Sequence, residues 1–136
     1  DIYQPTLDVA KENALKYGLS QVRFACGAWF EALDQQKFDL IVSNPPYIDP
    51  DDIHMQKLKS EPERALIAAN HGLADIETII SQGKDWLKPR GWIVLEHGYD
   101  QGQAVCDIFE QYGFNQIQTI KDYGGNDRVS LGQKLD

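Results

Sequence analysis

Four consecutive residues, Asn44, Pro45, Pro46 and Tyr47, are of the types that can hold and orient a planar amino group. Asn44 offers a side-chain carbonyl as an acceptor, and the prolines, whose φ angles are fixed, contribute carbonyls without a competing N–H. The ring of Tyr47 can lie on a planar amide or base and orient its nitrogen. Because an amino nitrogen is a poor nucleophile, a site that aligns it and stabilises its developing positive charge accelerates methylation. The motif therefore predicts an amino methyltransferase, and the alternative is a strand-ending turn with a surface tyrosine.

The element that must position this motif is the stretch Phe38–Ser43, where Phe, Leu, Ile and Val occur without polar alternation. Such a run predicts a strand buried on both faces, and the two prolines end it because they cannot continue a ladder. In open α/β sheets, ligands bind at the carboxyl ends of the strands. We therefore expect Asn44–Tyr47 at the edge of a sheet where chemistry takes place.

The composition is that of one soluble globular domain, with 136 residues, 42% hydrophobic and 25% charged. The sequence has neither an apolar run of 18 residues nor a signal-peptide pattern, so we expect no membrane span and a cytoplasmic location. The net charge of −8 opposes attachment to phosphate backbones, which disfavours duplex nucleic acid as a partner. Cys26 and Cys106 have no partner spacing and are expected to be reduced core thiols.

The rest of the chain alternates helical and strand patterns. A helix is expected from Pro5 to a stop at Gly18, and others from Leu73 to Leu87, ended by Lys88–Gly91, and from Gln103 to Tyr112. Strands are expected at Val22–Cys26 and Trp92–Glu96, and a closing hairpin at Gln116–Ile120 and Arg128–Gly132. This order predicts an α/β fold whose sheet is mostly parallel with a C-terminal antiparallel hairpin.

Polar or aromatic residues also stand at other predicted strand ends. Asp1 precedes a helix, where a carboxylate can hold ribose hydroxyls, although a helix-flanking charge is the alternative. Trp29 follows the Val22–Cys26 strand and either flanks a bound ring or is a core aromatic. Glu96 and His97 approach the same crevice as Asn44 and suggest general acid/base work. Because transfer of a methyl group to an amide needs no strong base, a structural role is favoured for this pair.

The segment from Ile48 to about Asn70 is polar and has no sustained period. A loop of this length predicts a lid or a substrate-binding loop. It contains carboxylates and a histidine at Asp49, Asp51, Asp52 and His54. The spacing lacks the glycine and terminal glutamate of a calcium loop, so we expect a solvated acidic loop and no metal.

Several motifs together resemble the catalytic domain of the release factor glutamine methyltransferases, the HemK/PrmC family. They are Ser43–Ile48, Glu61-Pro62 with Ala65-Leu66, Leu95–Gly98, and Asp122–Gly124 with Asp127–Val129. The resemblance runs over practically the whole chain. Asn-Pro-Pro-Tyr alone is shared with amino methyltransferases that act on adenine in DNA and RNA, and the flanking motifs narrow the match to this family.

The resemblance implies a class I S-adenosylmethionine-dependent, Rossmann-like fold and methylation of the glutamine in the Gly-Gly-Gln motif of peptide-chain release factors, with S-adenosylhomocysteine as product. It implies that Asn44 and the Pro45 carbonyl accept hydrogen bonds from the substrate amide, that Tyr47 packs on its plane, and that Asn44 also lies beside the cofactor. It further implies that Asp1 binds the ribose hydroxyls and that Trp29 lies near the adenine.

Two departures from the family pattern affect the expected site. Ala28 stands where the family commonly has Asp, which removes a polar contact to the adenine amino group and predicts weaker cofactor binding. The glycine-rich cofactor loop, the first strands and the N-terminal helical domain of the family would precede Asp1. We therefore expect residues 1–136 to be a partial catalytic domain, inactive alone. Two other classes stay open: an adenine or cytosine amino methyltransferase acting on DNA or RNA, and a noncatalytic domain that binds protein through residues 44–70.

Overall fold

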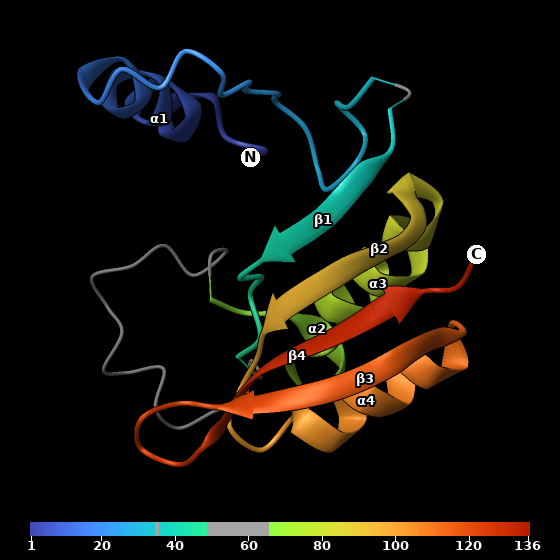
Figure 1. The fold of residues 1–136 in the computed structure, drawn as a ribbon. Coiled ribbons are helices and arrows are strands. Elements are labelled where there is room, and N and C mark those ends of the chain that lie inside the picture. Colours follow the sequence, from blue (N-terminus) through green and yellow to red (C-terminus); the bar gives the residue numbers. More distant parts are fainter. Residues whose placement is uncertain (35, 49–65) are drawn as a thin grey trace. The chain divides into compact units, whose positions relative to one another are not determined.

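The computed structural model describes residues 1–34, 36–48 and 66–136, in two compact units, Asp1–Gln36 and Lys37–Asp136 (Figure 1). The first unit contains helix α1 (Gln4–Lys16), which has Pro5 in its first turn and buries Leu7 and Ala14. It is followed by Gly18 at a φ of 67°, a left-handed conformation that glycine adopts without steric cost. The predicted helix and its glycine stop are confirmed.

The predicted strand Val22–Cys26 is wrong, because this stretch belongs to no strand. In the described part of the chain its main chain pairs with Asp1: the amino group of Asp1 donates to the Ala25 carbonyl over 3.3 Å, and Gly27 N–H donates to the Asp1 carbonyl over 3.0 Å. A single residue is too short a partner for a ladder. Cys26 is exposed, so the expectation that it is a core thiol is also wrong.

The second unit is built on one sheet of four described strands in the order β1-β2-β4-β3. These are β1 (Phe38–Ser43), β2 (Leu87–Glu96), β3 (Phe114–Lys121) and β4 (Asp127–Lys134). β1 and β2 are parallel, and the other two pairs are antiparallel. The predicted α/β class and the closing hairpin are confirmed. The prediction of a mostly parallel sheet is wrong for the described strands, whose sheet is mixed because β4 pairs antiparallel with both of its neighbours.

Helices α3 (Ala74–Trp86) and α4 (Gly102–Gln111) pack on the same face of this sheet (Figure 1), and the short α2 (Ala69–Gly72) precedes α3. The core between helices and sheet consists of fully buried apolar side chains, among them Ile76, Ile79, Ile80, Ile93, Leu95, Val105 and Phe109. Gly132 on β4 lets Phe109 approach closely, because a Cβ there would lie 2.7 Å from its ring. This packing fixes the strand ends of the second unit.

β1 is not buried on both faces, in contrast to the prediction. Leu40 is 52% exposed and Val42 is 68% exposed, whereas Ile41 is opposite buried Ile93 on the helix-covered face. The described residues give β1 one strand neighbour and place the helices of its unit on one side. The apolar sequence of β1 therefore indicates two cover layers, of which the described part of this unit supplies one.

The helix predicted at Leu73–Leu87 is confirmed as α3, which ends at Trp86. The strand predicted at Trp92–Glu96 begins earlier, at Leu87, so Lys88–Gly91 are part of β2. The pairing of β1 with β2 shifts between Phe38, opposite Leu87, and Leu40, opposite Trp92, which forms a bulge. Arg90 lies in this bulge with a φ of 62°. Across the described residues, no helix is both long and apolar enough to cross a membrane.

Candidate active site

The Asn44–Tyr47 corner lies at the carboxyl edge of the parallel pair β1 and β2, because Ser43 is opposite Leu95 in the register. Asn44 is exposed, Pro45 is buried, and Pro46 and Tyr47 are half-buried. The side chain of Asn44 has no hydrogen-bond partner among the described residues. Its carbonyl thus stays available as an acceptor at the sheet edge, next to prolines that fix the backbone.

Tyr47 is held at both ends. Its hydroxyl donates to Glu96 Oε1 over 3.0 Å, and its main-chain carbonyl accepts from Gln101 Nε2 over 3.0 Å. Burial raises the pKa of the Tyr47 hydroxyl above its usual value, and the carboxylate of Glu96 raises it further, while Arg128 acts in the opposite direction. The phenol is therefore neutral and its ring is anchored by hydrogen bonds within the protein.

Glu96 and His97 are adjacent in sequence but do not share a site. Glu96 reaches Tyr47, whereas His97 is fully buried. Successive side chains at a strand end point to opposite faces, so only one of the two can face the Asn44–Tyr47 corner. The expectation that both side chains approach the same crevice is therefore wrong for His97. The complete burial of His97 supports the structural role that the sequence favours.

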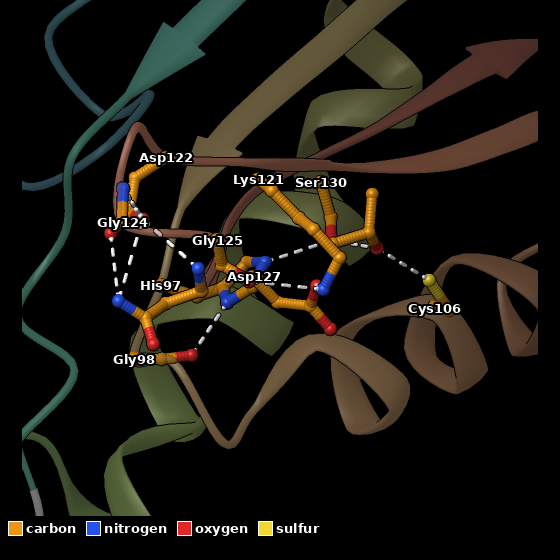
Figure 2. A network of polar contacts seen from close by, with 11 residues as sticks. His97, Gly98, Cys106, Lys121, Asp122, Gly124, Gly125, Asp127 and Ser130 are labelled. Atoms are coloured by element: carbon orange, nitrogen blue, oxygen red, sulfur yellow. Dashed lines mark hydrogen bonds and ion pairs between the residues drawn. The ribbon is translucent and has the colours of Figure 1, made fainter.

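His97, which follows β2, begins a chain of buried and half-buried polar contacts that reaches β4, β3 and α4 (Figure 2). Its Nδ1 is 2.8 Å from the carbonyl of Gly98, which accepts, and its Nε2 is 2.9 Å from Ser130 Oγ. Ser130 Oγ is 2.8 Å from Thr119 Oγ1, which is 3.3 Å from Cys106 Sγ. Because each of these groups finds a polar partner, the chain satisfies polar atoms within the sheet.

The turn between β3 and β4 is at the same edge as the corner, since Glu96 is opposite Val129. Asp122 Oδ1 accepts from the N–H of Gly124 over 2.8 Å and of Asn126 over 3.0 Å (Figure 2). These bonds, that of Asn126 first, lower the pKa of the Asp122 carboxyl. Asp122 Oδ2 is also 3.6 Å from Arg128 Nη2, and Arg128 Nη1 donates to the His97 carbonyl over 3.3 Å. The turn thus positions the arginine that influences Tyr47.

The cofactor-binding candidates Asp1, Ala28 and Trp29 belong to the first unit. Asp1 Oδ1 accepts from the Tyr3 N–H over 2.8 Å at the start of α1, and Asp1 is exposed. The main-chain bonds between Asp1 and residues 25 and 27 place the two predicted strand ends side by side. Ala28 is half-buried, and Trp29 is 39% exposed with a φ of 46°. A left-handed conformation is unusual for a tryptophan and often marks a functional position.

The loop that follows Tyr47 falls mostly on residues 49–65, outside the described part of the chain, and with it Asp49, Asp51, Asp52 and His54 and the Glu61-Pro62 motif. Its two ends are paired: Ile48 N–H donates to the Leu66 carbonyl over 2.8 Å, and Ala68 N–H donates to the Ile48 carbonyl over 3.0 Å. Within residues 1–34, 36–48 and 66–136, no group of three His, Cys, Asp or Glu is placed to hold a metal ion.

Sequence reasoning missed two residues that contact Tyr47 or its surroundings. Arg128 was part of a recognised motif but received no role. Gln101 was not singled out, and its one signal was its place immediately before the apolar helix α4, where it is the N-cap residue. A polar residue at such a position usually caps a helix, so its side chain gave no indication of a contact with the loop after Tyr47.

Comparison with known proteins identifies methyltransferases. Residues 5–125 match the family model described as Eco57I restriction-modification methylase. The chain is 49% identical to a release factor glutamine methyltransferase of Francisella tularensis (strain SCHU S4) over 98% of this chain and 48% of that protein. It is 43% identical to a protein of the same name from Escherichia coli (strain K12) over 93% of this chain and 47% of that protein. The chain thus spans about half the length of the curated relatives it matches.

Solved structures support the fold. A methyltransferase from Pyrococcus furiosus superimposes with a TM-score of 0.73 at 18% identity, over all of this chain and 61% of that one. The ribosomal protein L11 methylase from Lactobacillus delbrueckii subsp. bulgaricus superimposes with a TM-score of 0.69 at 19% identity, over all of this chain and 56% of that one. The fold is that of the class I methyltransferases. Relatives of this name share 41 to 49% of the residues over almost the whole chain, and the chain belongs with them to the release factor glutamine methyltransferases, the HemK/PrmC family.

Proposed function

We propose that the protein containing this chain is a cytoplasmic enzyme that transfers a methyl group from S-adenosylmethionine to the side-chain amide of the glutamine in the Gly-Gly-Gln motif of peptide-chain release factors. Residues 1–136 are then part of its catalytic domain. The observation that carries the proposal is the Asn44–Tyr47 corner, which stands at the carboxyl edge of β1 and β2 with its tyrosine anchored by Glu96 and Gln101. The name shared by the sequence relatives supports the same reaction.

In this proposal the corner acts on the substrate amide. The side-chain carbonyl of Asn44 and the main-chain carbonyl of Pro45 accept the two amide N–H groups, with Pro46 holding the turn, and the ring of Tyr47 lies on the amide plane. As the nitrogen forms its bond to the methyl carbon it becomes positive, and the two carbonyl dipoles stabilise that charge. The nitrogen then releases one proton to solvent, and the electron pair of the broken carbon–sulfur bond stays on sulfur.

The first unit supplies residues that fit the nucleoside part of the cofactor. S-adenosylmethionine provides a methyl group activated by a positively charged sulfur. The exposed carboxylate of Asp1 can accept hydrogen bonds from ribose hydroxyls, and the exposed ring of Trp29 can flank the adenine. The half-buried methyl group of Ala28 adds no polar contact.

The test is methyl transfer by the full-length protein to a purified release factor, with mass spectrometry of the Gly-Gly-Gln peptide. Asn44→Ala should lower kcat by about 100-fold or more, the range found when one preorganised polar contact to the transition state is removed. Asn13→Ala, on the exposed surface of α1, is the matched control and should keep the rate of the unchanged protein. Absence of methylation by the unchanged protein, or equal rates for the two variants, contradicts the proposal.

A second candidate is an amino methyltransferase that acts on adenine or cytosine in DNA or RNA. The description of the matching family model, a restriction-modification methylase, favours it, whereas the net charge of −8 counts against a nucleic-acid substrate. Oligonucleotides containing adenine and cytosine belong in the same assay. Methylation of oligonucleotides without methylation of release factor selects this second function.

A further inference from the structure

We propose that Gln101 is a positioning residue for methyl transfer. Its side chain holds the main chain of Tyr47 and of His71 against the turn that follows β2. The inference rests on the proposed function and adds a residue to its site. Gln101 makes no contact with the substrate amide in this proposal. It acts through Tyr47.

The amide group of Gln101 joins two segments that are distant in sequence, at Tyr47 and at His71, to the turn that Gln101 forms with Gly98. Its Oε1 accepts from the Gly98 N–H over 2.7 Å. Its Nε2 donates to the carbonyl of Tyr47 over 3.0 Å and to the carbonyl of His71 over 2.9 Å. The residue is 8% exposed, so these bonds are largely shielded from water. Both amide hydrogens and the amide oxygen are therefore used within the protein.

The segments that Gln101 joins follow the two parallel strands or connect them. Tyr47 follows β1, Gly98 follows β2, and His71 lies where the chain returns from the loop after Tyr47 and enters α3. In a sheet of this type, the ligand site is bounded by such connections. One side chain thus sets the relative positions of the corner and of the connections beside it.

The chain at His71 is strained and closely packed against Tyr47. Asn70 and His71 have φ angles of 54° and 52°, and Gly72 continues at 78°. A Cβ at Gly72 would lie 2.0 Å from the carbonyl oxygen of Tyr47 and 2.7 Å from Gln101 Nε2. Two non-glycine residues in the left-handed region persist only where the surrounding contacts hold them, and they cluster at functional sites. The bond from Gln101 to the His71 carbonyl is one such contact.

The chemistry of the three contacts restricts the residue type. The three contacts of Gln101, which together form a brace, need an acceptor for the Gly98 N–H and two donors for the carbonyls of Tyr47 and His71. Glutamine has both on one terminal group, whereas glutamate is acceptor-only when ionised. Without the donors, two carbonyls are left unpaired and the main chain of Tyr47 is free to shift. A misplacement of about 1 Å can cost about 100-fold in rate.

The experiment uses Gln101→Glu, which keeps the acceptor for the Gly98 N–H and removes both donors. Gln101→Met, which has no polar amide and adds no charge, is the second variant. Gln103→Glu is the matched control, because Gln103 is exposed two residues further along α4 and bonds to Asp107 on the surface. All are made in the full-length protein and assayed by release factor methylation, by binding of S-adenosylhomocysteine, and by amide hydrogen exchange.

We expect both Gln101 variants to lower kcat per folded molecule by about 10- to 100-fold, with the Kd for S-adenosylhomocysteine changed less than about threefold. Hydrogen exchange should rise in residues 66–73, while the Gly98 amide stays protected in Gln101→Glu. Gln103→Glu should match the unchanged protein. Unchanged kcat in both Gln101 variants, or a loss explained entirely by a smaller folded fraction, overturns the inference. If the unchanged protein does not methylate release factor, the proposed function fails, while faster exchange in residues 66–73 alone still supports the brace.

Discussion

The second unit contains two tyrosines held in the same way, one at the proposed site and one away from it. The hydroxyl of Tyr47 donates to Glu96 over 3.0 Å, and that of Tyr112 donates to Glu77 over 3.1 Å. The carbonyl of Tyr47 accepts from Gln101 Nε2, and that of Tyr112 accepts from Lys84 Nζ over 2.7 Å.

The two tyrosines differ in what they join. Tyr112 follows α4 and bonds to residues of α3, so its contacts fix one helix on the other. Tyr47 follows β1 and two prolines, and its contacts fix the strand-end motif beside exposed Asn44. A tyrosine held at both ends is therefore not by itself evidence for chemistry. The place of Tyr47 at the carboxyl edge of a parallel strand pair is what supports a role in the reaction.

The largest difference between the two tyrosines is expected in methyl transfer. Tyr47→Ala removes the ring proposed to lie on the substrate amide, so kcat should fall by about 100-fold. Tyr112→Ala should stay within about twofold of the unchanged protein when rates are divided by the folded fraction from circular dichroism. Equal losses in the two variants would show that the tyrosines serve the fold alone.

A second comparison concerns the glycines near each loop. Gly72 and Gly125 both have positive φ angles, 78° and 84°, but a Cβ at Gly125 has no heavy atom within 4 Å. Gly125→Ala should cost about 1 kcal/mol, from the left-handed conformation alone. Gly72→Ala adds a clash with the Tyr47 carbonyl and should cost about 2–4 kcal/mol. Urea denaturation of both variants gives the two free energies of unfolding.

If Gly72→Ala is no more destabilising than Gly125→Ala, the close approach of residues 70–72 to Tyr47 does not exist in solution. That result would also remove a support of the brace formed by Gln101, since Gln101 Nε2 lies 2.7 Å from the same Cβ position.

Local patterns predicted much of this fold. The Pro5 start and Gly18 stop of α1, the apolar periods of α3 and α4, and the hairpin around Asp122 depend on residues close in sequence. The predictions failed where contacts with residues distant in sequence decide the structure. Val22–Cys26 has strand composition but pairs with no strand in the described part of the chain, and β1 has a core sequence but exposes Leu40 and Val42.

The candidate site likewise has one part that the local sequence predicts and another part that only the fold brings together. The corner from Asn44 to Tyr47 was predictable because the motif is contiguous and follows a strong strand signal. The partners Glu96, Gln101 and Arg128 come from 49 to 81 residues away, and only the fold brings them to Tyr47. Because Glu96 and His97 are adjacent in sequence, the sequence predicts one shared crevice for them. Side chains alternate along a strand, however, so these two lie on opposite faces.

Removing the hydroxyls alone should produce a smaller and more selective effect. Tyr47→Phe and Tyr112→Phe each delete one hydrogen bond to a glutamate and should each lower the free energy of unfolding slightly. Only Tyr47→Phe should lower kcat, by about threefold to tenfold, because its ring loses one of two anchors. Kinetics and urea denaturation on the same samples separate the two effects. A lower kcat in Tyr112→Phe would argue that helix packing controls the rate.

The smallest expected effect is on the titration of the two phenols, and it tests the causes of their shifts. Both pKa values are raised above 10.0, but burial is the first cause for Tyr47 and the hydrogen bond with Glu77 is the first for Tyr112. A raised pKa favours the neutral phenol in the folded state. The contribution of that neutral phenol to the stability of the fold is therefore complete below pH 10 and is lost as pH rises through the folded pKa. Glu77→Gln should therefore return the pKa of Tyr112 most of the way to 10.0, whereas Glu96→Gln should leave much of the shift of Tyr47. NMR titration of tyrosine ring carbons resolves both. A Tyr47 that titrates at 10.0 in Glu96→Gln would mean that the carboxylate, rather than burial at the corner, keeps this phenol neutral.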